Sequence, residues 1–190
     1  SPALDNTQTT VYTFTPTVGQ CATTATMTIE VNPLPTLDTI TATPACINSP
    51  STVTMTGLLP STAGSFTYTN SMTGPAVYTV SGVSDASGNF TFDTPNLPAA
   101  ANGAIITITS GTATASGCTA NFTGKTVTVV VGKVTTWTGT IWDQGTPTSI
   151  DTAVIPLAYS EVANIDACSL VVNTNAVVTI PSGSNVTLHG

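Results

Sequence analysis

The sequence carries very little positive charge. Its 190 residues include two lysines, Lys125 and Lys133, and nine acidic residues, which give a formal net charge of −7. Nucleic acids and anionic membranes are both bound through basic surfaces. The composition therefore excludes nucleic acid as a partner. No apolar run approaches the roughly 18 residues of a membrane helix, so we expect no membrane insertion.

Residues that support catalysis or metal binding are scarce as well. His189 is the sole histidine, and none of the cysteines, Cys21, Cys46, Cys118 and Cys168, has CxxC spacing. A Ser-His-Asp or Cys-His site and a zinc site are thus disfavoured. The acidic residues show no paired-carboxylate motif. We expect no catalytic residues, no metal and no cofactor, and we interpret the widely spaced cysteines as disulfide partners in an oxidising compartment.

Threonine is abundant and accounts for about one residue in five. It is β-branched and suits the exposed side of a pleated sheet. The stretch Val11–Val31 shows the pattern clearly, because apolar residues alternate with threonines on both sides of a Val-Gly-Gln turn. Period two predicts two half-buried antiparallel strands. We assign residues 1–33 to the C-terminal strands of a partial Ig-like repeat.

Residues 34–132 show seven strand-like runs with Gly, Pro and Asn between them. Short strands with this punctuation predict an Ig-like β-sandwich. The last run places Val127, Val129 and Val131 on one face, which predicts a central core strand. The expected strands are Leu37–Thr43, Ser51–Thr56, Ser65–Thr69, Val77–Ser81, Asn89–Asp93, Ala104–Ser110 and Lys125–Val131.

Residues 133–190 follow a different rule, with apolar pairs that recur every eight residues. The pairs are Leu170 with Val172, Val178 with Ile180, and Val186 with Leu188. A short strand plus turn at constant period predicts a β-solenoid-like module or a tight meander, here truncated. The whole chain is therefore expected to be all-β.

The residues of the first and last parts resemble a known family. SPALDNTQTTVYTFTPTVGQCATTATMTIEVNP, over residues 1–33, resembles Ig-like repeats of very large surface proteins of Bacteroidetes, especially flavobacteria. Those proteins leave the cell through the type IX secretion system, and a gliding-motility adhesin is among them. Trp142-Asp143, Gly145-Thr146-Pro147 and Cys168-Ser169-Leu170 resemble a module that often precedes their sorting domain. The resemblance is moderate over residues 34–132.

The resemblance implies a bacterial cell-surface location and two kinds of modification. Cys46 and Cys118 fall where such repeats carry an early and a late cysteine, and they bracket the middle part of the sequence. We predict that they pair, closing a loop of about 70 residues that would stabilise the fold by roughly 4 kcal/mol. Asp38-Thr39-Ile40 and Asp151-Thr152-Ala153 match the Asp-Thr pattern of Bacteroidetes O-glycosylation, so Thr39 and Thr152 are candidate acceptors.

Three functions are compatible with this sequence. The first is a structural segment of a long extracellular adhesin or filament, which serves adhesion or gliding and contacts neighbouring repeats or copies of itself. The second is a carbohydrate-binding accessory region of a secreted hydrolase, in which Trp137 and Trp142 form a platform for surface polysaccharide, although tryptophans pack more often in a core. The third is a fibre subunit whose residues 1–33 donate strands to the next molecule.

Overall fold

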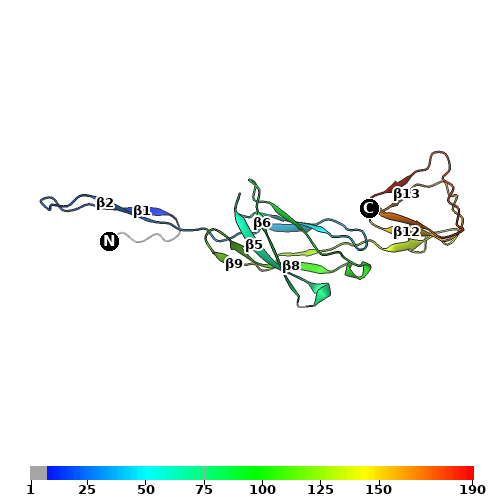
Figure 1. Ribbon diagram of the computed structural model, residues 1–190, viewed down its shortest axis with the longest axis horizontal. Coiled ribbons are helices and arrows are strands. Elements are labelled where there is room, and N and C mark those ends of the chain that lie inside the picture. The colour runs from blue at the N-terminus through cyan, green and yellow to red at the C-terminus, as the bar shows by residue number, and fades with distance from the viewer. Residues whose placement is uncertain (1–7, 75) are drawn as a thin grey trace.

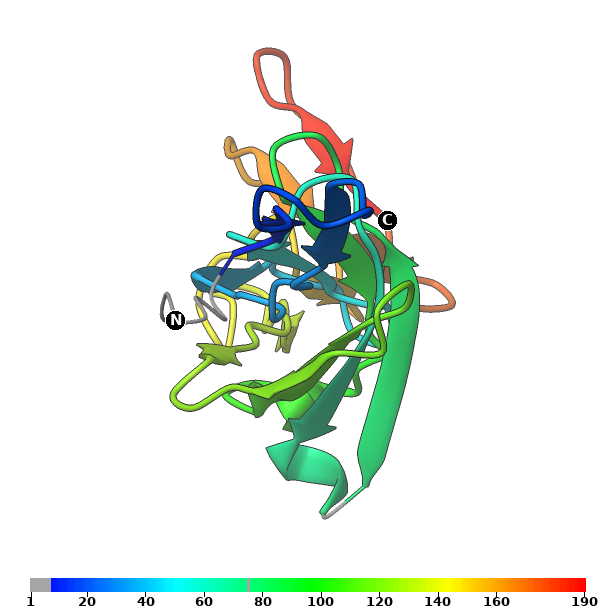
Figure 2. The same ribbon diagram turned by 90° about the vertical axis from the view of Figure 1, so that its left-hand side faces the viewer.

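The computed structural model describes residues 8–74 and 76–190, and these form three parts that follow one another along the long axis (Figure 1). The first is an antiparallel hairpin of β1 (Thr10–Phe14) and β2 (Ala25–Ile29). The expected alternation is present, but the hairpin is not half-buried. Val11, Phe14 and Met27 are 60%, 57% and 45% exposed. Figure 2 looks along the long axis, with the hairpin in front of the sandwich.

The middle part is a sandwich of two antiparallel sheets. One sheet has the order β3-β4-β7, and the other has the order β10-β8-β5-β6 with β9 also paired to β8. Two 3₁₀ turns, Ser71–Thr73 and Ala99–Ala101, lie in the connections. The strands are β3 (Thr39–Ala42), β4 (Thr52–Thr56), β5 (Ala63–Asn70), β6 (Val77–Val83), β7 (Phe90–Asp93), β8 (Ile105–Ala113), β9 (Thr119–Asn121) and β10 (Thr126–Thr128).

Alternating apolar residues of the two sheets form the sandwich core. Val53 and Met55 from one sheet and Ile106 and Ile108 from the other are fully buried. Tyr68 crosses the interface to Phe92, with ring centroids 5.0 Å apart. Facing sheets with interdigitated side chains are the architecture that the strand spacing predicts. The predicted core face of the last strand is confirmed, because Val129 and Val131 are buried and Val127 packs against the core. Its predicted central position is wrong, since β10 is an edge strand that pairs with β8.

The third part is a coil of parallel strands. β11 (Val134–Thr136), β12 (Thr152–Ile155) and β14 (Ser169–Val172) stack in one sheet, and β13 (Ile165–Ala167) stacks on β15 (Val186–Leu188) in a second. Tyr159 and Val178 form a parallel bridge on a third side. Parallel stacking of successive turns of chain is a solenoid arrangement and excludes the meander. Among the described residues, no helix is long and apolar enough to cross a membrane.

The eight-residue step has a structural explanation in this coil. Leu170 lies on β14, Val178 on the bridge and Val186 on β15, so the step separates successive sides of one turn. A whole turn is longer, because Thr152 pairs with Ser169 and Ile165 with Val186. The domain boundaries at 33/34 and 132/133 stay a prediction.

Candidate functional site

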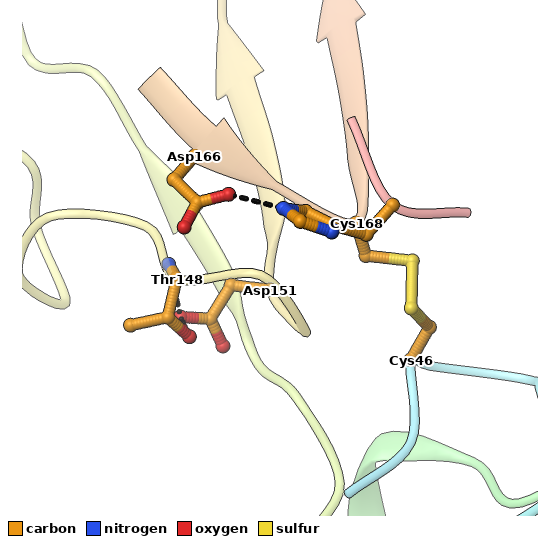
Figure 3. A network of polar contacts seen from close by, with 6 residues as sticks. Cys46, Thr148, Asp151, Asp166 and Cys168 are labelled. Carbon is orange, nitrogen blue, oxygen red and sulfur yellow. Dashed lines mark hydrogen bonds and ion pairs between the residues drawn. A yellow bond between two sulfur atoms is a disulfide. The ribbon is translucent and has the colours of Figure 1, made fainter. Parts of the chain in front are cut away.

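A disulfide between Cys46 and Cys168 fastens the sandwich to the coil (Figure 3). The two Cα atoms are 6.0 Å apart, and the sequence separation is 122 residues. The prediction that Cys46 pairs with Cys118 is therefore wrong. Cys118 carries a free thiol, as does Cys21, which is exposed in the hairpin turn.

The two ends of the sandwich explain why Cys118 does not pair with Cys46. Ala45 is hydrogen-bonded to Val130 and Gly132, so Cys46 lies where the chain leaves the sandwich for the coil. Cys118 is hydrogen-bonded to Ala113, which lines a small cavity with Pro35 and Thr36 at the chain's entry. Residues that bracket a segment in sequence need not meet in space, and here they lie at opposite ends of the sandwich.

A buried carboxylate holds the junction together. Asp151 is only 3% exposed. Its Oδ1 accepts a hydrogen bond from the backbone N–H of Lys133 at 2.9 Å. Its Oδ2 accepts bonds from the backbone N–H and the hydroxyl of Thr148, at 3.0 and 2.8 Å (Figure 3). A buried carboxylate must be compensated by such donors. Since the backbone carbonyl of Asp151 also accepts from Cys168 N–H at 2.8 Å, one residue ties the sandwich exit to the disulfide.

The backbones at this junction are in close contact. A Cβ on Gly132 would lie 1.8 Å from the carbonyl oxygen of Ile150. Only glycine therefore fits where the sandwich meets the first turn of the coil. Near Cys168 in sequence, Asp166 on β13 and His189 after β15 are hydrogen-bonded at 2.6 Å, which links these two segments.

The two tryptophans do not form the flat platform that we considered. Trp137 is 3% exposed and donates its indole N–H to the carbonyl of Ala158 at 3.1 Å, inside the coil. Its ring meets that of Trp142 at an interplanar angle of 60° with 5.6 Å between centroids. Edge-to-face contact of this kind is core packing. The platform prediction is therefore wrong for Trp137, while Trp142 is partly exposed.

Trp142 forms part of an open cleft of about 370 Å³ in the coil. A short hairpin presents it, because Trp137 and Trp142 form an antiparallel bridge and Asp143 Oδ1 accepts from Thr136 N–H at 2.7 Å. The opposite wall comes from the next turn of the coil and includes Tyr159 and Glu161. Burial, and then the negative charge of Glu161, raises the pKa of the Tyr159 hydroxyl. No sequence pattern indicated this wall, because about 20 residues separate it from the hairpin.

The candidate glycosylation sites differ in accessibility. Thr39 is exposed on β3, the edge strand of its sheet, and its hydroxyl lies 2.7 Å from that of Thr56. Thr152 is half-buried on β12, the central strand of its sheet, and accepts a hydrogen bond from Ser169. The aspartate that precedes Thr152 is buried in the junction. The structure therefore leaves Thr39 as the more accessible acceptor.

Comparison with known proteins does not assign the chain to a family. No protein-family model, no curated protein and no solved structure matches the chain. The resemblance to bacterial surface repeats thus stays a prediction. Within residues 8–74 and 76–190, no group of three or more His, Cys, Asp and Glu side chains could hold a metal ion.

Proposed function

We propose that this chain is a non-catalytic, load-bearing segment of a long extracellular surface protein that serves adhesion. The observation that carries the proposal is the Cys46–Cys168 disulfide, which fastens the sandwich to the coil in an elongated molecule. A tether under tension is weakest where separately packed parts meet. A covalent bond at that point, beside a buried carboxylate, is what such a tether needs.

The same bond supports an extracellular location. Disulfides form and persist in oxidising environments outside the cytosol. The composition is compatible with an extracellular location. The sequence has two lysines and no arginine, so it offers trypsin-like proteases only two sites. Its many threonines offer hydroxyls that glycans can modify. Gliding motility and type IX export belong to the same proposal, and they rest on the resemblance of residues 1–33.

Surface labelling of intact cells tests this function. We expect an antibody raised against the folded chain to label unpermeabilised cells, and external proteinase K to remove the signal. A cytosolic antigen that persists under proteinase K serves as the control. Label that enters only after permeabilisation, together with free thiols at Cys46 and Cys168 in rapidly quenched cells, would contradict the proposal.

A further inference from the structure

The cleft beside Trp142 has the chemistry of a small-molecule site. Its walls combine the partly exposed Trp142 ring with side chains that have unused donors or acceptors. Among the described residues, neither the indole N–H of Trp142 nor the carboxylate of Glu161 makes a protein hydrogen bond, and Asn164 uses only its Oδ1, which accepts from Asn185 N–H at 3.0 Å. Asn164, whose amide N–H₂ makes no hydrogen bond within the described residues, lines the same open space as Thr140 and Thr146.

These groups match the surface of a sugar. A pyranose ring presents a patch of C–H bonds that stacks on an aromatic face, with hydroxyls around its edge that both donate and accept. The cleft supplies one accessible aromatic ring, donors in the indole and amide N–H groups, and an acceptor in the Glu161 carboxylate. Such sites combine an apolar surface with a few polar groups.

The charge of the cleft restricts the class of sugar. Glu161 is the only charged residue that lines it. Neither lysine lines it: Lys125 donates to the carbonyl of Asp38, and Lys133 donates to that of Gln144, the residue before Gly145. Without a cation among its lining residues, the cleft offers no charged partner to a carboxylate, sulfate or phosphate on the ligand. Acidic polysaccharides and nucleotides are therefore disfavoured.

The ring geometry disfavours an organic cation. An aromatic cage holds an ammonium group over the faces of several rings. Here the ring centroids of Trp137, Trp142 and Tyr159 are only 5.0–6.0 Å apart, which is direct ring-to-ring contact. Trp137 and Tyr159 are 3% and 2% exposed. No space remains between the rings, and a ligand can lie only over the open side of Trp142.

From this geometry we infer that the cleft between the Trp142 hairpin and residues 159–164 binds one or two residues of a neutral saccharide. This goes beyond the load-bearing role and does not depend on it. The hairpin fixes Trp142 before binding, because Thr138 N–H and Thr138 Oγ both bond to the carbonyl of Ile141, at 2.9 and 2.8 Å. A preorganised aromatic loses little entropy when a ligand stacks on it. Many copies of so shallow a site would bind a polysaccharide through avidity.

Affinity electrophoresis of the full chain tests the inference, with dextran, mannan and galactan as neutral polymers and polygalacturonate as an acidic one. We expect at least one neutral polymer to retard the chain and polygalacturonate to leave it unchanged. Fluorescence titration with the matching oligosaccharide gives the dissociation constant, and because both tryptophans lie in this cluster, the emission reports on the site directly.

Variants locate the site. Trp142→Ala should weaken binding at least about tenfold. Thr146→Arg fills the cleft from an exposed position, so it should abolish binding with the fold intact, even if Trp142→Ala fails to fold. Phe14→Ala removes an exposed aromatic on the hairpin and should change nothing. Three results would overturn the inference: no retardation by any neutral polymer, wild-type affinity in Thr146→Arg, or binding of choline chloride that Glu161→Gln abolishes.

Discussion

Reduction of the Cys46–Cys168 disulfide should greatly lengthen the chain that unfolds when the molecule is pulled from its two ends. With the bridge intact, force passes from one cysteine to the other across the sulfur atoms. The segment between them, which contains most of the sandwich and two turns of the coil, then bears no load. Only residues outside the bridged loop can extend.

The size of the effect follows from the loop. A separation of 122 residues, at about 3.4 Å of extended chain per residue, corresponds to roughly 420 Å of hidden contour length. Single-molecule force spectroscopy with handles at Ser1 and Gly190 measures this length. The oxidised chain should show a total contour length roughly 420 Å shorter than the chain reduced before pulling.

Two results would refute the reasoning. Equal contour lengths under both conditions would mean that no bridge carries the load. A difference near 250 Å would indicate the Cys46–Cys118 pairing, because that loop hides about 70 residues. The variants separate these cases. Cys46→Ser should give the full length without reductant, whereas Cys118→Ser, which changes a free thiol, should behave as the wild type.

Three further predictions concern stability. Asp151→Asn turns an N–H₂ toward backbone N–H groups, so it should lower the free energy of unfolding by about 2 kcal/mol in urea titrations. The exposed control Glu30→Gln should change this free energy little. Equal effects of the two substitutions would contradict the role of the buried carboxylate. Gly132→Ala places a methyl group against the Ile150 carbonyl and should cost about 3 kcal/mol; an unchanged melting temperature would contradict the close approach. Asp85 accepts from the N–H groups of Asn89 and Ser87, which lowers the pKa of its carboxyl below the ordinary 3.8. A carboxyl group whose pKa is lower in the folded state stabilises the fold at pH values above its unfolded-state pKa. This stabilisation is lost as the pH falls through the folded-state pKa. Asp85→Ala should thus lower the melting temperature at pH 7 and by progressively less below about pH 4; a pH-independent difference would contradict this.

Much of the sandwich could be predicted because each strand is indicated by a local sequence pattern. The seven runs expected from apolar alternation and from Gly, Pro and Asn turns all coincide with observed strands between β3 and β10. β9 (Thr119–Asn121) was missed, since Thr-Ala-Asn has no apolar alternation and pairs only through its contact with β8. The eight-residue repeat of apolar pairs indicated the coil. This step is the spacing between successive sides of one turn, and a whole turn is longer.

The junction and the cleft could not be predicted, because both depend on contacts between distant segments. Cys46 lies beside Cys168 because β14, which follows Cys168, stacks on β12. Trp137 and Trp142 share a residue type and a short stretch of sequence, yet Trp137 is buried in the coil whereas Trp142 is partly exposed in the cleft. Asp151 matched a glycosylation pattern, whereas its buried hydrogen bonds give it a structural role.

Tryptic mapping of the native chain under non-reducing conditions tests the disulfide-clamped junction most directly. Cleavage after Lys125 and Lys133 divides the chain so that Cys168 lies in the last peptide, while Cys21, Cys46 and Cys118 lie in the first. With Cys46 bonded to Cys168, residues 1–125 and 134–190 should remain one covalent species that separates on reduction, and Cys46→Ser should release it without reductant. Recovery of free 134–190 from the native wild-type chain would contradict the account.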